Sequence, residues 1–384
     1  MAVTEHVVPD FAPDALPPMD VAARIDRLRK LFEQSQIDAL LVTNLVNVRY
    51  LCGFTGSAGL LLITPDEAVF VSDGRYRDQS AAELSGAGVN ARIDIVGADP
   101  DSAIADAVRA AGVKRLGLEE QSVSWALQRR WDSELFTGGN LVPTGGLVEE
   151  LRLVKEPAES ARIRSACAIA DRALMDVRHR LADGPTEIEF GLELDARMRQ
   201  LGAADVSFET IVASGPNGAK PHHHPSRRQI VEGDLVVIDF GALVDGYHSD
   251  MTRTLAVGDI GPQRQKMFDV VIESQQAGVD AVAQGVEASA VDAACRAVID
   301  DAGWGDAFLH GTGHGVGLDI HEEPRVSSRS AATLVAGHVV TVEPGVYLPD
   351  LGGVRIEDTL LVTEDGSDRL TRATKDPSVD ASIG

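Results

Sequence analysis

The chain of 384 residues carries 35 lysine and arginine residues against 59 aspartate and glutamate residues, a formal net charge of −24. So acidic a chain repels phosphate backbones and anionic membrane surfaces, and we expect neither a nucleic acid nor a membrane as its partner. Its hydrophobic content of 44% is enough to bury a sizeable core, and its length predicts two or three domains at about 100–200 residues each.

The first residues and the cysteines give little sign of export. Residues 1–20 are rich in proline and acidic side chains and predict a flexible leader, without the basic and then apolar segments of a secretory signal. Cys52, Cys167 and Cys295 are far apart and fit neither a disulfide framework nor a CxxC metal site. We expect buried thiols in a reducing compartment, and therefore a cytoplasmic protein.

The N-terminal part alternates helical and strand patterns. A hairpin is expected over residues 60–75, where two β-rich runs flank a turn at residues 64–67. Other helices are expected over residues 21–36 and 101–113, and other strands over residues 37–44 and 114–120. This alternation is typical of an α/β domain.

A turn-rich cluster at residues 143–146 marks a change of pattern. We expect the α/β domain to cover residues 21–147 and a second domain to cover residues 148–384. Thr186 and Glu189 form the pattern of a capping box at the start of a helix. Further helices are expected over residues 157–182, 262–284 and 287–302, with strand-rich sequence from Phe208 onward and again at the C-terminus. Helices and antiparallel strands in separate blocks predict an α+β domain.

Two aspartates interrupt apolar strands of the second domain. Asp239 ends the apolar run 235–238, and Asp250 precedes another strand. Asp245-Gly246 marks a hairpin turn between them, which predicts that the two aspartates lie close together and roughly opposite one another. Buried carboxylates are costly unless they are paired or bound to metal. The alternative is a pair of solvent-facing aspartates on an exposed hairpin face.

A second carboxylate pair follows near the C-terminus. Glu343 and Glu357 lie on two strands joined by a turn at residues 349–353. Because the hairpin is symmetric about Asp350, the two glutamates are expected to lie nearly opposite one another.

Between the two pairs, the glycine-rich segment 308–324 contains His310, His314 and His321. Four carboxylates and an imidazole suit two divalent cations. We expect Mn²⁺, with Co²⁺ or Zn²⁺ as alternatives, and two such cations can activate water for hydrolysis.

Together these segments resemble the metal-binding motifs of the proline-specific and methionine aminopeptidase superfamily, whose catalytic domain has the pita-bread fold. The resemblance covers roughly residues 150–365. The stretches RYLCGFTGSAG and VFVSDGRY are similar to the creatinase-type N-terminal domain of Xaa-Pro aminopeptidases and prolidases. The resemblance therefore implies an α+β chain, with a pita-bread domain after an α/β domain, in the proline-specific branch of metallopeptidase family M24.

The resemblance also implies metal ligands. Asp239 would bind one metal ion and His314 the other, while Asp250 and Glu357 would bridge both. Glu343 would bind the ion shared with His314 and would carry the proton during catalysis.

Substrate and supporting residues are implied in the same way. His222 and His321 would contact substrate, while Arg355 and Tyr347 would support the metal site, and Tyr347 would also border the substrate. Arg355 is also counted among the catalytic residues. His310 matches a position often occupied by histidine and is grouped with the substrate-binding residues, although the resemblance leaves its exact role open. His223 and His224 leave the alignment of His222 uncertain by one residue, and a solvated loop is the alternative for this triplet.

The function implied is hydrolysis of the Xaa-Pro bond at the N-terminus of proline-containing peptides, by a homodimer. The nearest alternative is an Xaa-Pro dipeptidase, or prolidase. A non-catalytic protein-binding module of the same fold stays an alternative: such modules usually lose metal ligands, and this chain keeps all five, but a net charge of −24 would suit basic protein partners. A metal-independent creatinase-like hydrolase shares the fold as well, but the intact ligand set argues against it.

Overall fold

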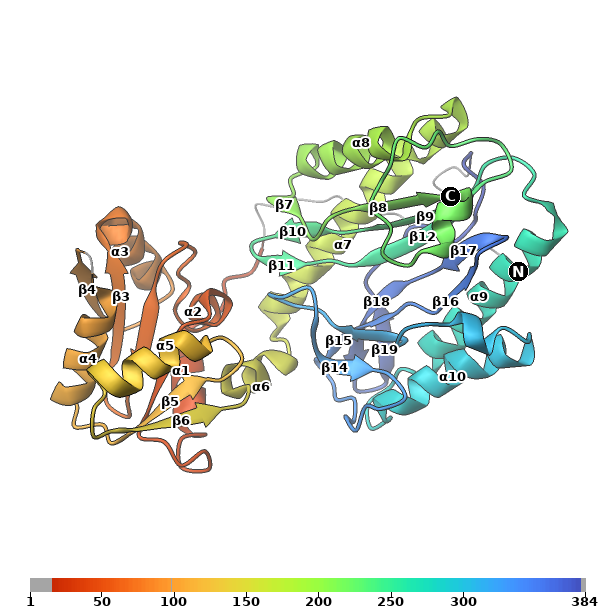
Figure 1. Cartoon of the computed structure of the whole chain (residues 1–384). Helices are drawn as coiled ribbons and strands as arrows, with labels where there is room; N and C mark the ends of the chain where they lie inside the picture. The colour runs from red at the N-terminus through yellow and green to blue at the C-terminus, as the bar shows by residue number, and fades with distance from the viewer. Residues whose placement is uncertain (1–15, 98, 381–384) are drawn as a thin grey trace. The chain divides into compact units, whose positions relative to one another are not determined.

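The computed structural model describes residues 16–97 and 99–380, so most of the leader expected at residues 1–20 lies outside the described residues. The chain forms two compact units, which divide between Arg152 and Leu153 (Figure 1). None of the helices in the described part of the chain is long and apolar enough to cross a membrane.

The N-terminal unit is built on a six-stranded mixed sheet with the order β4-β3-β2-β1-β5-β6. Its strands are β1 (Ala39–Val42), β2 (Leu60–Ile63), β3 (Ala68–Asp73), β4 (Arg92–Val96), β5 (Arg115–Glu119) and β6 (Asn140–Thr144). Its helices are α1 (Ala22–Arg29), α2 (Leu45–Cys52), α3 (Arg77–Gly86), α4 (Pro100–Ala110), α5 (Trp125–Arg130) and α6 (Leu147–Leu153). All four residues of β1 are buried. Both faces of the sheet are therefore covered there, which explains an apolar run without alternation.

The predicted hairpin at residues 60–75 is confirmed, because β2 and β3 pair with Ile63 opposite Ala68. The helix predicted over residues 21–36 is too long, since α1 ends at Arg29 and turns follow it. Gln36 has a φ of 55°, which a continuing α-helix does not permit, so the predicted helix could not extend to residue 36.

The named strands of the C-terminal unit pair antiparallel throughout. Its helices are α7 (Pro157–Val177), α8 (Glu187–Gln200), α9 (Gly261–Ala281) and α10 (Ala288–Asp301). Its strands are β7 (Asp205–Val206), β8 (Ile211–Ser214), β9 (Leu235–Phe240), β10 (Ala242–Val244), β11 (Tyr247–His248), β12 (Met251–Ala256), β13 (Gly313–Gly315), β14 (Glu322–Val326), β15 (Val339–Val342), β16 (Gly345–Leu348), β17 (Gly352–Arg355), β18 (Asp358–Thr363) and β19 (Gly366–Arg369).

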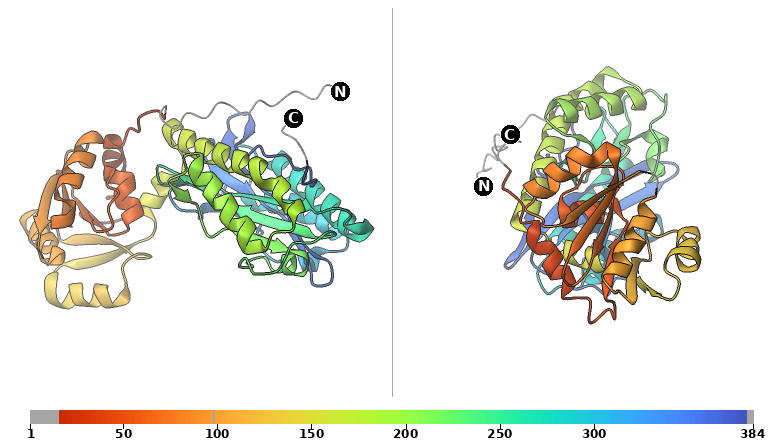
Figure 2. Two further views of the ribbon diagram at one scale, coloured as in Figure 1. Left: turned by 90° about the horizontal axis from the view of Figure 1, so that it is seen from above. Right: turned by 90° about the vertical axis from the view of Figure 1, so that its left-hand side faces the viewer.

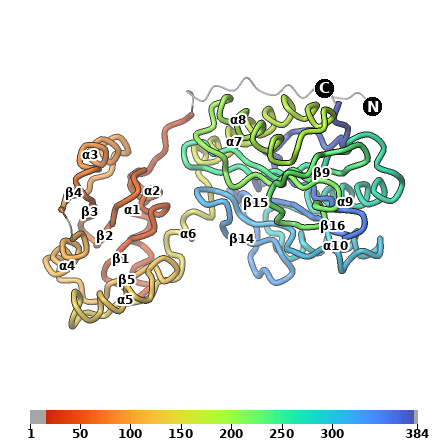
Figure 3. The backbone as a smooth tube through the Cα atoms, turned by 45° about the horizontal axis from the view of Figure 1, so that its top comes forward, coloured from red at the N-terminus to blue at the C-terminus, as the bar shows by residue number. Residues whose placement is uncertain are grey.

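The helices of this unit lie in two pairs. Helices α7 and α8 run side by side across one side of the strands (Figure 2), while α9 and α10 lie together on the other side (Figure 3). The capping box at the start of α8 is confirmed, with the Glu189 amide 3.2 Å from Oγ1 of Thr186. The helix predicted over residues 157–182 is α-helical only to Val177, and a 3₁₀ segment, Arg178–Asp183, completes it.

Each helix pair covers its own apolar cluster. Leu174 and Phe190 of α7 and α8 pack with Ile238 of β9. Val271 and Val291 of the other pair belong to a second cluster, which includes residues of β15, β17 and β18. Strands from both clusters supply the carboxylates described next, so packing of the two halves brings those carboxylates together.

Candidate metal centre and substrate cleft

The two aspartates come from neighbouring strands of the first cluster. The β9–β12 ladder pairs Asp239 with Thr252, so Asp250 is the diagonal neighbour of Asp239. The two aspartates therefore lie close together, as expected, but diagonally rather than directly opposite, because the turn at Asp245-Gly246 centres the hairpin between Val244 and Tyr247. An offset of two keeps both side chains on one face. Asp250 is 5% exposed, which rules out the solvent-facing alternative for this residue.

The two glutamates lie next to strands of the second cluster. Val342 pairs with Asp358, and Gly345 pairs with Arg355. This common register places Glu343 directly opposite Glu357, as the symmetry about Asp350 predicted. At this point the ladder opens, and the amide of Glu357 donates instead to the carbonyl of Thr252, at 3.1 Å. That bond joins the glutamate pair to the aspartate pair.

His314, on β13, faces these carboxylates. Its Nε2 lies 3.4 Å from Oδ2 of Asp250 and 3.5 Å from Oε1 of Glu343. Its Nδ1 lies 2.9 Å from the carbonyl oxygen of Gly315 and donates to it, so the lone pair of Nε2 is directed at the carboxylates. Burial lowers the pKa of His314 to about 3. This neutral imidazole is the form that binds metal.

Burial makes it unfavourable for the carboxyl groups of this cluster to be ionised. Burial and then repulsion from Glu357 raise the pKa of Asp250 well above its ordinary value, and burial and Glu343 do the same to Glu357. Burial also raises the pKa of Glu343 to about 8, against the opposing effect of Arg355. Several carboxylates in one buried space therefore repel one another unless protons or cations intervene.

Oxygens without donors show where cations would fit. Ligand oxygens of Asp239, Asp250 and Glu357 lie within 4.8 Å of one another. Among the described residues, Oδ1 of Asp239 and Oε1 of Glu357 are buried and have no hydrogen-bond partner. Carboxylate oxygens beside an imidazole lone pair form a donor set for divalent cations. The residues present therefore fit the metal ions that the sequence predicted.

A polar chain supports the cluster from one side. Arg355 donates from Nη2 to Oδ2 of Asp239 at 2.7 Å and from Nη1 to Oη of Tyr347 at 2.8 Å. Nδ1 of His310 donates to the carbonyl of Gly311, which leaves Nε2 of this neutral imidazole as an acceptor. Tyr347, which accepts from the guanidinium, therefore donates from Oη to Nε2 of His310, 2.8 Å away. His310, whose role the resemblance left open, thus orients Tyr347.

A cleft of about 490 Å³ opens over the carboxylates. Its lining includes the following predicted site residues: Asp239, Asp250, His314, Glu343, Arg355, His222, His310 and His321. The rings of His314 and His321 have their centroids 4.3 Å apart. Tyr347 and Glu357 are buried beneath this lining. The structure thus brings the predicted site residues to one place.

The histidine triplet divides into three environments. His222 lines the cleft. Nε2 of His223 instead lies 2.9 Å from a carboxylate oxygen of Glu187, and His224 has a side chain that is 79% exposed. Of the three, only His222 reaches the cleft, so the geometry favours that alignment.

Three residues near the site were not found from the sequence. Oγ1 of Thr252 donates to Oε2 of Glu357 at 2.8 Å and accepts from Nε of Arg355 at 3.1 Å. Thr252 is two residues after Asp250, and this spacing on a strand could have indicated a shared face. Arg325 and Arg329 line the cleft, and the signal was two arginines closely following the histidine segment.

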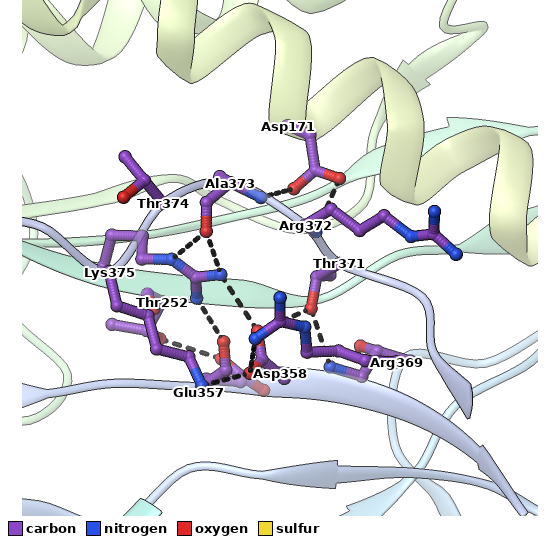
Figure 4. Close-up of polar contacts among 12 residues, drawn as sticks. Asp171, Thr252, Glu357, Asp358, Arg369, Thr371, Arg372, Ala373, Thr374 and Lys375 are labelled. Atoms are coloured by element: carbon purple, nitrogen blue, oxygen red, sulfur yellow. Dashed lines mark hydrogen bonds and ion pairs between the residues drawn. The ribbon is translucent and has the colours of Figure 1, made fainter. Parts of the chain in front are cut away.

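Behind Glu357, a second ionic cluster holds the strand in place (Figure 4). Asp358 is 0% exposed and contacts Nη2 of Arg253 at 2.9 Å and Nζ of Lys375 at 2.7 Å. Burial acts to raise the pKa of Asp358, but Arg253 and Lys375 bring it below its ordinary value. Arg253 also donates to the backbone carbonyls of Glu357 and Ala373. This cluster therefore ties the C-terminal segment to the backbone of Glu357.

Comparison with known proteins agrees with this geometry. The sequence profile described as "Metallopeptidase family M24" matches residues 161–364. The chain belongs to this metallopeptidase family. The profile described as "Creatinase/Prolidase N-terminal domain" matches residues 24–154. Both matches confirm the family resemblance and the expected combination of an α/β unit with a pita-bread unit.

Three similar proteins extend this result. "Uncharacterized peptidase YqhT" of Bacillus subtilis is 41% identical over 92% of this M24 chain and 99% of its own length. The structure of "Xaa-Pro dipeptidase from Bacillus anthracis" is 38% identical, with a TM-score of 0.87, and the match covers 93% of this chain and 99% of that one. The structure of the X-Pro aminopeptidase from Thermotoga maritima MSB8 is 33% identical, with a TM-score of 0.83, and the match covers 92% of this chain and 98% of that one.

Proposed function

We propose that this M24 metallopeptidase hydrolyses the Xaa-Pro bond at the N-terminus of peptides with two divalent cations. The observation that supports this most is the buried donor set with unpartnered oxygens on Asp239 and Glu357, within the part of the chain that the structure describes. The similar proteins named Xaa-Pro dipeptidase and X-Pro aminopeptidase support the choice of substrate. Mn²⁺ is the expected ion, with Co²⁺ or Zn²⁺ as alternatives.

Each ligand has a position suited to its proposed role. Asp239 would hold one ion and His314 the other, with Glu343 beside His314. Asp250 and Glu357 would serve both ions, and Asp250 lies near both Asp239 and Nε2 of His314. When bound, such cations lower the pKa of water and polarise a carbonyl group.

The chain's own groups would handle protons and substrate. The carboxyl group of Glu343 lines the cleft and is placed to take a proton from the attacking water and to pass it to the leaving nitrogen of proline. His222 and His321 line the same cleft and would donate to the substrate backbone or to the developing oxyanion. Arg355 would keep Asp239 oriented throughout.

A second candidate function is an Xaa-Pro dipeptidase. Arg325 and Arg329 line the cleft, and a guanidinium pairs well with a carboxylate. A dipeptide would place its free C-terminal carboxylate in the cleft, whereas a longer peptide would not. The two arginines therefore favour dipeptides, while the aminopeptidase remains the first proposal.

Hydrolysis of matched substrates tests the proposal. An Xaa-Pro dipeptide and an Xaa-Pro-Xaa tripeptide are each incubated with Mn²⁺, and EDTA serves as the control. Cleavage of the tripeptide at the Xaa-Pro bond, abolished by EDTA, is expected. Cleavage of the dipeptide alone would identify a prolidase. Failure to cleave either with any divalent ion would contradict the proposal and favour the protein-binding module.

We also propose that the peptidase is a cytoplasmic homodimer. Its three cysteines are free and buried in the structure, which suits a reducing compartment. The dimer rests on the family resemblance. Light scattering coupled to size-exclusion chromatography would measure the mass, and a mass of one chain would contradict the dimer.

A further inference from the structure

A buried glutamate outside the metal cluster holds both ends of one loop. Glu187 begins α8, and its side chain is 0% exposed. Its Oε1 accepts from the amide and the hydroxyl of Ser214, at 2.8 and 2.7 Å. Its Oε2 accepts from the amide and the hydroxyl of Ser226, at 3.0 and 2.6 Å. One carboxylate therefore closes the loop formed by residues 215–226.

The same carboxylate also binds two side chains within the loop. Nδ2 of Asn217 lies 3.1 Å from Oε1, and Nε2 of His223 lies 2.9 Å from Oε2. Although burial acts to raise it, the hydrogen bonds from Ser226 and Ser214, together with that from Asn217, lower the pKa of Glu187 to about 2. The group is thus an anion that accepts hydrogen bonds from both ends and the interior of the loop.

The other side of the loop is fixed to the metal site. Nη1 of Arg355 lies 3.3 Å from the carbonyl oxygen of Pro221. Gly218 packs so closely that a Cβ atom there would lie 2.9 Å from the backbone nitrogen of Gly353. His222 follows Pro221 directly, so its backbone lies between two points of attachment, Arg355 on one side and Glu187 on the other.

We propose that Glu187 is a positioning residue for His222, because it holds the loop 215–226 in the conformation that presents the imidazole to the cleft. His223 takes part by filling the remaining space at the carboxylate. This inference rests on the proposed function, in which His222 contacts the substrate.

The test is a double-mutant cycle with Glu187→Gln and His222→Ala in the full chain loaded with Mn²⁺. Glu187→Gln keeps the size of the side chain but removes its charge and replaces one acceptor with a donor. We expect kcat/KM to fall by about 10-fold or more, by analogy with other supporting residues. In the His222→Ala background the same substitution should change kcat/KM by less than about twofold, because coupled residues are not additive.

A matched control comes from the same helix turn. Glu189 is exposed, and among the residues that the structure describes it bonds only to Thr186 at the helix cap. Glu189→Gln should keep the capping box, which glutamine also forms, and leave kcat/KM unchanged. Mn²⁺ affinity should be the same in wild type, Glu187→Gln and Glu189→Gln, since none of these changes touches a proposed ligand.

Hydrogen–deuterium exchange separates this inference from the proposed function. Without substrate, amides of residues 215–226 should exchange faster in Glu187→Gln than in wild type or Glu189→Gln. If wild type cleaves no Xaa-Pro peptide, the proposed function fails, and exchange alone then decides whether Glu187 anchors the loop.

Two results would overturn the inference. One is an equal loss of kcat/KM from Glu187→Gln with and without His222. The other is unchanged exchange across residues 215–226 in a folded Glu187→Gln protein. Should that variant not fold, Ser226→Ala removes only one donor to Glu187 and is subject to the same cycle and the same criteria.

Discussion

Arg355 forms a hydrogen bond with one carboxylate oxygen of Asp239, so the other oxygen stays available to bind a cation. Nη2 of Arg355 donates to Oδ2 at 2.7 Å, while Oδ1 of the same carboxylate is buried and has no partner among the residues described. The arginine also bonds to Tyr347 and to Thr252. The orientation of Asp239 is therefore set before any ion binds, by a residue that is itself held by two other side chains.

Arg355→Gln should weaken metal binding. A neutral side chain cannot keep Asp239 aligned as the guanidinium does, and supporting residues of this kind alter metal affinity or activity by about 10–100-fold. Isothermal titration with Mn²⁺ measures the affinity. The exposed Arg227 offers a matched control, because Arg227→Gln should leave the affinity unchanged. Equal affinities in the two variants would contradict this role.

Asp250→Asn should make the thermal stability of the protein less dependent on bound metal. The substitution removes one of several mutually repelling carboxylates, so the metal-free protein should unfold at the same temperature as wild type or higher. Added Mn²⁺ should raise the Tm of wild type, because it binds the native state, and should raise the Tm of Asp250→Asn much less. Differential scanning calorimetry with and without EDTA provides the comparison, with the exposed Asp280→Asn as control. An unchanged Mn²⁺ response would remove Asp250 from the ligand set.

His321→Ala should lower the rate but keep the metal. Its ring lies beside His314 in the cleft and has no place among the proposed ligands. Loss of one hydrogen-bond donor to a developing oxyanion costs about 10²–10³ in kcat. Steady-state kinetics should show this loss, whereas His224→Ala, at a largely exposed position, should match wild type. A His321→Ala enzyme with unchanged kcat would exclude the residue from catalysis.

The stability that Glu187 contributes should depend on acid pH. Its pKa falls from an ordinary 4.5 to about 2 in the folded protein. Between these values the unfolded chain binds more protons than the native one, so native stability from this group is complete above pH 4.5 and is lost as the pH falls toward 2. Urea denaturation of metal-free wild type and Glu187→Gln across this range gives the difference. A constant difference would show that folding does not lower the pKa of Glu187.

Lys375→Met should destabilise the C-terminal unit. It would leave the fully buried Asp358 with one fewer cation, and breaking a buried ion pair costs on the order of 3 kcal/mol. Urea denaturation would measure the loss, and the exposed Lys30→Met should differ little from wild type. If both variants unfold at the same urea concentration, Lys375 is not needed to hold Asp358.

The sequence indicated which residues approach one another wherever the relation was local. The symmetry of the hairpin about Asp350 predicted the register of Glu343 and Glu357, because one turn fixes every pair along a two-stranded ladder. The same reasoning placed Asp239 and Asp250 close together, while their diagonal offset of two residues appears only in the strand register. The capping box of Thr186 and Glu189 is local as well, and it was predicted correctly.

Tertiary structure decided what no local pattern could. The bond from the Glu357 amide to the Thr252 carbonyl joins two hairpins 105 residues apart in the chain, and only packing of the two halves creates it. The same holds for the choice among three adjacent histidines, since the contact of His223 with Glu187 spans 36 residues. The sequence by itself determined the donor types and their local spacing, because these depend on turns and strand periodicity. The fold decided which oxygens lack partners and which histidine faces the cleft, because these depend on contacts between segments distant in the chain.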